Sequence, residues 1–247
     1  MTRTLTLQGA GRSYRAYVPP GSGPVALVVV MHGYGGGAAE IEQASGWTAE
    51  ARRQGFAVLY PEGVAQAFNA GLCCGTPAQA GVDDVGAVLA MVDDLARTRP
   101  VDAARLYATG FSNGGMMAYR LACETDRFAA VAPVAATQVV GCSSRQPTSI
   151  LHVHGAADDV VRLDGQPGRL GVATPAVPGV IEGWRTVLRC EPATTSSTGP
   201  LTTSAARCPD GREVTLVTVD GLGHGWPARG TYEIAPTVWW FFDGHRR

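Results

Sequence analysis

Continuous apolar runs recur along the chain and alternate with segments that read as helices. The runs are typical of strands buried on both faces of a sheet, and they span residues 26–31, 56–60, 106–108, 129–135 and 149–154. The segments that read as helices span residues 40–53, 83–95, 116–121, 180–188 and 232–242. Strands that alternate with helices predict an α/β fold with a mostly parallel, doubly wound sheet.

The pattern differs at its ends. Polar and apolar residues alternate over 4–7 and 14–18, which predicts an antiparallel N-terminal hairpin joined through residues 9–12.

A further strand is expected at 213–219, and the Gly- and Pro-rich stretch 165–179 is expected as a surface loop, with a possible role in a substrate cleft. Because no repeat or linker divides the chain, we expect one catalytic domain over residues 1–247.

Composition narrows the classes of partner. The chain has 247 residues, of which 45% are hydrophobic and 17% charged, and its net charge is −1. It has no basic field that would attract nucleic acid or an anionic membrane, so neither is expected as a partner. The longest apolar run, residues 25–31, is too short to span a bilayer.

The six cysteines are an even number, which favours disulfides and an oxidising compartment over buried free thiols. Cys190 and Cys208 flank a loop rich in Thr and Ser and are expected to pair, with a stabilisation of roughly 3 kcal/mol. Cys142 could pair with Cys123 or with one of the adjacent Cys73 and Cys74. No secretory leader is recognised, so we expect a secreted protein whose leader has been removed.

The most informative motif lies at residues 106–117, which read as strand, sharp turn and helix. A serine stands at the turn, Ser112, with Gly110 and Gly114 two residues to either side. This is the G-x-S-x-G nucleophile elbow, in which glycines allow strand and helix to approach closely and the serine hydroxyl stands exposed. We therefore predict Ser112 as a nucleophile.

A serine nucleophile needs a base, and His224 fits best among the five histidines. It lies between glycines in a loop that follows the predicted strand 213–219, at the carboxyl edge of the sheet. The alternative is a loop histidine that has no catalytic role. The other histidines end strands, lie inside one or belong to the tail: His32, His154, His152 and His245.

A carboxylate must orient that imidazole. Asp158 and Asp159 both follow the predicted strand 150–154, and either fits by position. An oxyanion hole is expected from the backbone N–H groups of Asn113, directly after the serine, and of Tyr34, in the Gly-rich loop 32–37. His32 is expected to fix that loop.

Two further features have competing interpretations. Trp226, beside the predicted base, could stack on an aromatic acyl group or sugar, or could pack its own loop. Asp83 and Asp84 could mimic a metal site, but helix capping is expected because no His or Cys lies beside them at ligand spacing. No metal is therefore expected.

With these residues placed, the chain resembles the α/β-hydrolase esterases of the polyhydroxybutyrate depolymerase and feruloyl esterase group. The matching segments follow the family order and span nearly the whole chain: residues 30–33, 69–75, 82–85, 110–123, 132–135, 154–158 and 223–227. The resemblance implies the α/β-hydrolase fold and ester hydrolysis without a cofactor. It implies Asp158 as the acid, because the family aspartate precedes one residue and two valines. The family often has proline where Asp159 stands.

The resemblance implies a serine esterase that acts through an acyl-enzyme on an ester substrate. Hydroxycinnamate (feruloyl-type) esters of plant polysaccharide are the first hypothesis, and polyhydroxybutyrate or related short-chain polyesters and oligomers are the alternative. An acetylxylan esterase or a serine peptidase is a further possibility. A binding protein without enzymatic activity would require that a triad residue be missing, and Ser112, Asp158 and His224 are all present. We expect a monomer.

Overall fold

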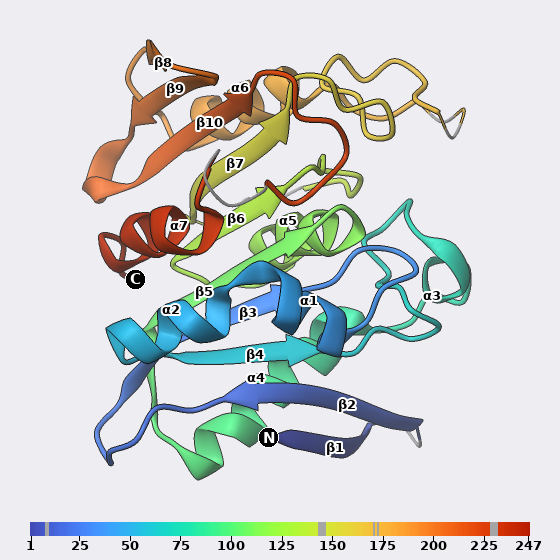
Figure 1. Cartoon of the computed structure of the whole chain (residues 1–247), viewed down its shortest axis with the longest axis vertical. Helices are drawn as coiled ribbons and strands as arrows, with labels where there is room; N and C mark the ends of the chain where they lie inside the picture. The colour runs from blue at the N-terminus through green and yellow to red at the C-terminus, as the bar shows by residue number, and fades with distance from the viewer. Residues whose placement is uncertain (8–9, 143–146, 170, 172, 228–231) are drawn as a thin grey trace.

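The structure, a computed structural model, describes residues 1–7, 10–142, 147–169, 171, 173–227 and 232–247. Its strands join in one sheet, in the order β1-β2-β4-β3-β5-β6-β7-β10-β9-β8 (Figure 1). They are β1 Thr2–Leu7, β2 Ala10–Tyr17, β3 Val25–Met31, β4 Ala57–Pro61, β5 Val101–Phe111, β6 Ala130–Val134, β7 Ser149–Gly155, β8 Thr194–Thr198, β9 Leu201–Arg207 and β10 Glu213–Val219.

The strands from β4 through β3, β5, β6 and β7 to β10 pair in parallel. At one edge β1, β2 and β4 pair antiparallel, and at the other β8, β9 and β10 do the same. The predicted parallel sheet and N-terminal hairpin are therefore confirmed. Because β2 begins at Ala10, the predicted connection at 9–12 starts outside the described residues and ends inside this strand.

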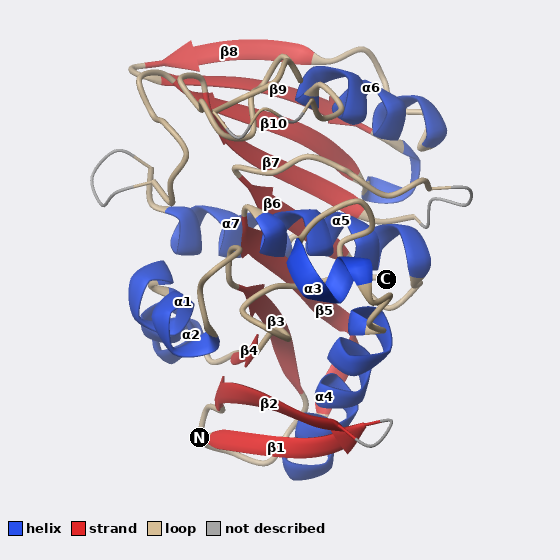
Figure 2. Ribbon diagram, turned by 90° about the vertical axis from the view of Figure 1, so that its right-hand side faces the viewer, coloured by secondary structure: helices blue, strands red, loops and turns tan. Residues whose placement is uncertain are grey.

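Helices cover both faces of the sheet. Figure 2 shows α1, α2 and α7 on one side and α4, α5 and α6 on the other. The helices are α1 Ala38–Ser45, α2 Trp47–Gln54, α3 Gly75–Gln79, α4 Asp84–Thr98, α5 Asn113–Glu124, α6 Val177–Val187 and α7 Ile234–Asp243, with a 3₁₀ turn at Pro209–Gly211. In β3, Leu27 and Val29 belong to one core, and Val28 and Val30 to the other. A strand buried on both faces must be apolar throughout, as the sequence is here.

The single helix predicted over 40–53 is wrong in one respect, because α1 and α2 are separate helices. Gly46 lies between them with a φ of 76°, in the left-handed region. A left-handed residue ends a helix, and glycine adopts this conformation without steric cost. The break turns Trp47 into the core, where it is fully buried.

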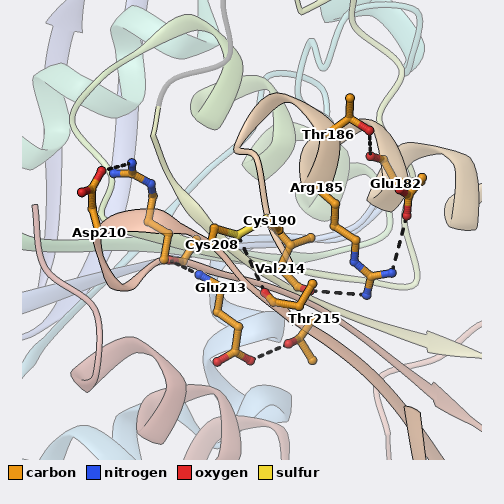
Figure 3. Close-up of a disulfide and its surroundings, with 12 residues drawn as sticks. Glu182, Arg185, Thr186, Cys190, Cys208, Asp210, Glu213, Val214 and Thr215 are labelled. Atoms are coloured by element: carbon orange, nitrogen blue, oxygen red, sulfur yellow. Dashed lines mark hydrogen bonds and ion pairs between the residues drawn. A yellow bond between two sulfur atoms is a disulfide. The ribbon is translucent and has the colours of Figure 1, made fainter. Parts of the chain in front are cut away.

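The loop predicted between Cys190 and Cys208 is instead the β8–β9 hairpin. Every residue of β8 is exposed, and the strand consists of threonine and serine only. The predicted Cys190–Cys208 disulfide is confirmed and joins the end of α6 to the end of β9 (Figure 3). Arg185 of α6 adds a hydrogen bond of 2.7 Å to the Ser204 carbonyl. Besides the pairing of β9 with β10, the edge hairpin is therefore held by one covalent link and one guanidinium.

The remaining cysteines form two more disulfides. Cys142 pairs with Cys123, one of the partners expected for it. The adjacent Cys73 and Cys74 pair with each other, which was not predicted.

The acidic pair at the start of α4 has two different roles. Asp83 caps the helix as predicted, and its Oδ1 accepts the Gly86 N–H at 2.8 Å. Capping is wrong for Asp84, which is fully buried and forms an ion pair with Arg12. Asp84 also accepts the backbone N–H of Asn69 at 2.7 Å. This buried carboxylate therefore anchors the segment that leads to Cys73.

Candidate active site

Ser112 lies at the turn between β5 and α5, with a φ of 52° and a ψ of −116°. A non-glycine residue at positive φ is strained, and such strain persists only when the surroundings hold it. Here the surroundings leave no room. A Cβ on Gly114 would lie 2.5 Å from the His32 carbonyl oxygen, and one on Gly110 would lie 2.5 Å from the Gly114 carbonyl carbon. Both glycines therefore allow the strand and the helix to approach closely, as predicted.

The structure brings Ser112, His224 and Asp158 together; they are called the triad below. His224 Nε2 lies 3.0 Å from Ser112 Oγ, and His224 Nδ1 lies 2.8 Å from Asp158 Oδ2. A carboxylate only accepts, so Nδ1 carries the proton and Nε2 presents its lone pair to the hydroxyl. The three residues follow β5, β7 and β10, whose carboxyl ends meet at one edge of the parallel sheet.

The structure distinguishes the two candidate acids. Asp158 is buried, and its Oδ1 accepts the backbone N–H groups of Val160 and Val161, each at 2.9 Å. Burial by itself raises the pKa of Asp158, but the hydrogen bond and charge of His224, with the Val160 amide, outweigh it and hold the pKa below its usual value. Asp159 is exposed and lies 3.7 Å from Arg169. Asp158 is thus the carboxylate aimed at the imidazole.

The loop after β3 is fixed by His32, as expected. Gly63 donates its N–H to His32 Nε2 at 3.0 Å, so Nδ1 carries the proton and donates to the Gly33 carbonyl at 2.8 Å. Burial lowers the pKa of His32, which keeps the ring neutral. A Cβ on Gly33 would meet the ring of Phe111 at 2.9 Å. This loop is therefore packed directly against the residue that precedes Ser112.

Tyr34 and Asn113 have amides suited to an oxyanion hole. Gly36 donates its N–H to the Gly33 carbonyl within the loop, and Gly35 donates its N–H to the Gln66 carbonyl in the segment after β4. The Tyr34 amide has no acceptor among the described residues. Asn113 is the first residue of α5, where N–H groups have no partner within the helix. Both amides are thus available to an incoming oxygen.

The Asn113 side chain has a role that sequence reasoning missed. It is fully buried, and its Oδ1 accepts the Phe68 N–H at 2.7 Å while its Nδ2 donates to the Phe68 carbonyl at 2.9 Å. The side chain thus bonds both backbone groups of a residue 45 positions away. Only the amide in the position after the serine could have been a signal. Asn113 fixes the loop before Cys73 against the elbow.

Two clefts lie close to residues of the triad, one beside Phe111, which precedes Ser112, and one beside Asp158. One has a volume of about 370 Å³ and is lined by the loop after β3, Phe111 and the half-buried Trp226, with Glu40 at its wall. The other has a volume of about 350 Å³ and lies beside Asp158. Besides Asp158, its charged lining residues are Asp159, Arg162 and Asp164. The first cleft is therefore aromatic in character, and the second is polar.

Comparison with known proteins gives consistent matches. A family model described as "Esterase PHB depolymerase" matches residues 12–181. NocK of Nocardia uniformis subsp. tsuyamanensis, named for an inferred esterase activity, is 34% identical over 96% of this chain and 76% of its own length. Feruloyl esterase C of Emericella nidulans is 31% identical over 94% of this chain and 83% of its own.

Among solved structures, an acetyl xylan esterase from Aspergillus awamori superposes with a TM-score of 0.71. The superposition covers 98% of this chain and 99% of that one, at 17% identity. At this sequence identity, the structural similarity supports only a shared fold. The α/β-hydrolase fold expected from the sequence is thereby confirmed.

Proposed function

The chain belongs to the esterase PHB depolymerase family, and we propose that it is a serine esterase that hydrolyses carboxylic esters through a covalent acyl-enzyme. The single observation that carries this proposal is the hydrogen-bonded series Ser112–His224–Asp158, with distances of 3.0 and 2.8 Å. In this series each group has the partner that its role in acyl transfer requires.

In the proposed first half-reaction, Ser112 Oγ attacks the ester carbonyl carbon while His224 Nε2 takes the hydroxyl proton. The carbonyl oxygen becomes an oxyanion, which the N–H groups of Tyr34 and Asn113 stabilise. Asp158 stabilises the imidazolium. The tetrahedral intermediate then collapses: the bond to the alcohol oxygen breaks, His224 protonates that oxygen, and the acyl group stays on Ser112.

In the second half-reaction, water replaces the alcohol. His224 takes a proton from the water, whose oxygen attacks the acyl carbon and forms a second oxyanion in the same position. Collapse breaks the bond to Ser112 Oγ, which recovers its proton from His224. The products are one carboxylic acid and one alcohol, and the reaction consumes one water.

The aromatic cleft supports a hydroxycinnamate ester as the substrate. Phe111 and Trp226 line the cleft next to the loop that carries Tyr34. A planar aromatic acid packs well between such rings, and we assign Trp226 to binding it. The polar cleft, with Asp159, Arg162 and Asp164, suits the hydroxyl groups of a sugar alcohol. A relative named as a feruloyl esterase agrees with this assignment.

A polyester of short hydroxy acids is the second candidate. Two large apolar side chains are exposed near the elbow: Tyr34 at 64% and Leu72 at 91%. Exposed apolar side chains can contact an apolar polymer. Acetylated xylan and peptide substrates remain the lower alternatives, without an observation of their own to favour them.

A hydrolysis panel separates these candidates. It contains methyl ferulate, p-nitrophenyl butyrate, hydroxybutyrate oligomers, acetylated xylan and a peptide amide. We expect methyl ferulate to have the highest kcat/KM. If the oligomers or the acetylated xylan were turned over faster, the feruloyl assignment would be wrong and the esterase assignment would stand.

The Trp226→Ala variant tests the acyl subsite. We expect a loss of about 10-fold in kcat/KM on methyl ferulate, equivalent to about 1.4 kcal/mol of ring contact. Hydrolysis of p-nitrophenyl acetate, whose acetyl group has no ring to stack on Trp226, should change by less than about twofold. Equal losses on both substrates would instead indicate that Trp226 only packs its loop.

We further propose that the protein is secreted, monomeric and one catalytic domain over residues 1–247. All six cysteines are paired, and structural disulfides persist in oxidising compartments. All the strands of the described residues belong to one sheet, with β1 at one edge and β8 at the other. Among the described residues, no helix has both the length and the apolar character needed to cross a membrane.

A further inference from the structure

Three buried side chains behind Asp158 have no part in the steps above. Tyr119 lies on α5, and His152 and His154 lie on β7. None is more than 1% exposed. Residues two apart on a strand face the same side, so His152 and His154 point together toward α5. A buried imidazole is costly unless both of its nitrogens have partners, so their contacts are informative.

The three side chains form a continuous series of hydrogen bonds. Tyr119 OH lies 2.7 Å from His152 Nδ1, and His152 Nε2 lies 3.0 Å from His154 Nδ1. His154 Nε2 lies 2.8 Å from the Val161 carbonyl oxygen. The same nitrogen lies 3.4 Å from Asp158 Oδ2, the oxygen that faces His224. The series of hydrogen bonds therefore ends at the Val161 carbonyl, and its last donor also lies beside the triad carboxylate.

The chemistry of its last acceptor fixes the direction of every bond. The Val161 carbonyl can only accept, so His154 Nε2 carries a proton. Burial lowers the pKa of His154, and burial together with the neighbouring His154 lowers the pKa of His152, so both rings stay neutral. His154 Nδ1 must then accept from His152 Nε2–H, and His152 Nδ1 must accept from Tyr119 O–H.

Val161 links His154 to Asp158 through its two backbone groups. Val161 donates its N–H to Asp158 Oδ1 at 2.9 Å, while its carbonyl accepts from His154. The N–H of His154 thus points between the Val161 carbonyl and Asp158 Oδ2. The ionisable groups that face His154 are His152 and Tyr119 on one side, and Asp158 and His224 on the other.

We propose that His154 is a positioning residue, which holds Asp158 in line with His224, and that Tyr119 and His152 fix the tautomer of His154 from behind. The proposal rests on the proposed function, because it concerns the residue assigned as the triad acid. Tyr119 thereby acts on the triad through two imidazoles, without touching a reacting atom. The catalytic aspartate is then supported from α5 as well as from its own loop.

The first test reads the tautomers directly and does not depend on activity. In ¹⁵N–¹H correlation spectra at pH 7.5, we expect His152 and His154 as two neutral Nε2–H rings among the five histidines. The His154→Gln variant assigns one of the two signals. A ring in the Nδ1–H form, or an imidazolium, at either position would overturn the proposal. If the tautomers are as expected but the protein hydrolyses no ester, the proposed function fails instead.

The second test measures the effect on hydrolysis. His154→Leu removes the donor, and we expect kcat on p-nitrophenyl acetate to fall roughly 10- to 100-fold with KM changed less than about twofold. His154→Gln keeps an N–H donor, and it should recover most of that loss. If His154→Leu and His154→Gln are equally impaired in kcat, the proposal is wrong, because a residue that only fills space would not distinguish them.

A matched pair of tyrosine variants covers the case in which His154→Leu does not fold. Tyr119→Phe removes only the hydroxyl that starts the series. Tyr107→Phe is its control, because Tyr107 is equally buried and donates at 2.8 Å to the His245 carbonyl in the C-terminal tail. We expect kcat to fall about 3- to 10-fold in Tyr119→Phe and not in Tyr107→Phe. Equal kcat values in the two variants would overturn the proposal.

Discussion

The elbow at Ser112 and the β8–β9 hairpin are both parts of the same sheet, but different forces hold them. Around the elbow, α5 is buried over most of its length, and the glycines at 110 and 114 leave no space for a Cβ. In the hairpin, all of β8 is exposed and its side chains are polar. The pairing of β9 with β10, the Cys190–Cys208 disulfide and Arg185 hold that edge (Figure 3).

The difference shows which part of the fold is kept rigid by close packing and which part depends on a covalent link. A residue held in a strained conformation, such as the proposed nucleophile Ser112, needs surroundings that cannot relax, and close packing in the sheet centre supplies them. An exposed edge of Thr and Ser buries too little apolar surface to stabilise itself, so a covalent link does that work. The centre should therefore respond to small changes of volume or charge, while the edge should respond mainly to reduction.

The largest effect is expected from Ser112→Ala at the centre. Removing the proposed nucleophile should lower kcat by roughly 10⁴- to 10⁶-fold, because the other triad members cannot replace it. Hydrolysis of p-nitrophenyl acetate measures this, with circular dichroism to show that the fold is kept. Activity near that of the unchanged protein would exclude Ser112 as the nucleophile.

The next largest effect is expected from Gly114→Ala. The new Cβ would lie 2.5 Å from the His32 carbonyl oxygen, and we expect unfolding to become easier by more than about 4 kcal/mol. Gly179→Ala is the control, because this helical position has nothing within 4 Å of a new Cβ. It should gain about 0.5–1 kcal/mol in urea unfolding. Similar values for the two variants would contradict the tight packing at the elbow.

Acid should destabilise the centre before the edge. His32, His152 and His154 have lowered pKa values in the fold, so below their ordinary value of about 6.5 the unfolded chain binds protons that the folded chain does not. Stability is complete above that pH and is lost as the pH falls toward the folded pKa values. With all three contributing, the slope should reach roughly 4 kcal/mol per pH unit.

Urea unfolding between pH 7.5 and 5.5 measures this slope. Asp94 and Asp158 also have lowered pKa values, but their sign is that of a carboxylate. Their stabilisation is complete above about pH 4 and is lost only below it, so they do not contribute in this window. A free energy of unfolding that stays flat from pH 7.5 to 5.5 would show that these histidines are not held neutral.

The smallest effect on function is expected at the edge. The double variant Cys190→Ser, Cys208→Ser opens a link across 18 residues and should cost about 3 kcal/mol in unfolding free energy. Its kcat should stay within about twofold of the unchanged protein, because the hairpin contributes no residue to the triad. A fall in kcat in proportion to the lost stability would show that edge and centre are coupled.

The same contrast explains what the sequence could predict. The central strands are continuous apolar runs, so the sheet could be predicted. The glycines around Ser112 have a spacing that few other structures need, so the elbow and the candidate triad could be predicted as well. The β8–β9 hairpin has no apolar periodicity to identify it, since β8 is made of threonine and serine only and β9 does not alternate polar and apolar residues. The helix break at Gly46 and the Asn113–Phe68 bonds depend on tertiary contacts, which spacing alone does not encode.

Labelling with a fluorophosphonate tests the central claim most directly, because the reagent is attacked only by an activated serine. The labelled protein is digested, and the modified peptide is identified by mass spectrometry. We expect one adduct, on Ser112, in the unchanged protein, and none in His224→Ala, where the base is absent. An adduct on a different serine, or equal labelling of Ser112 without His224, would contradict the account.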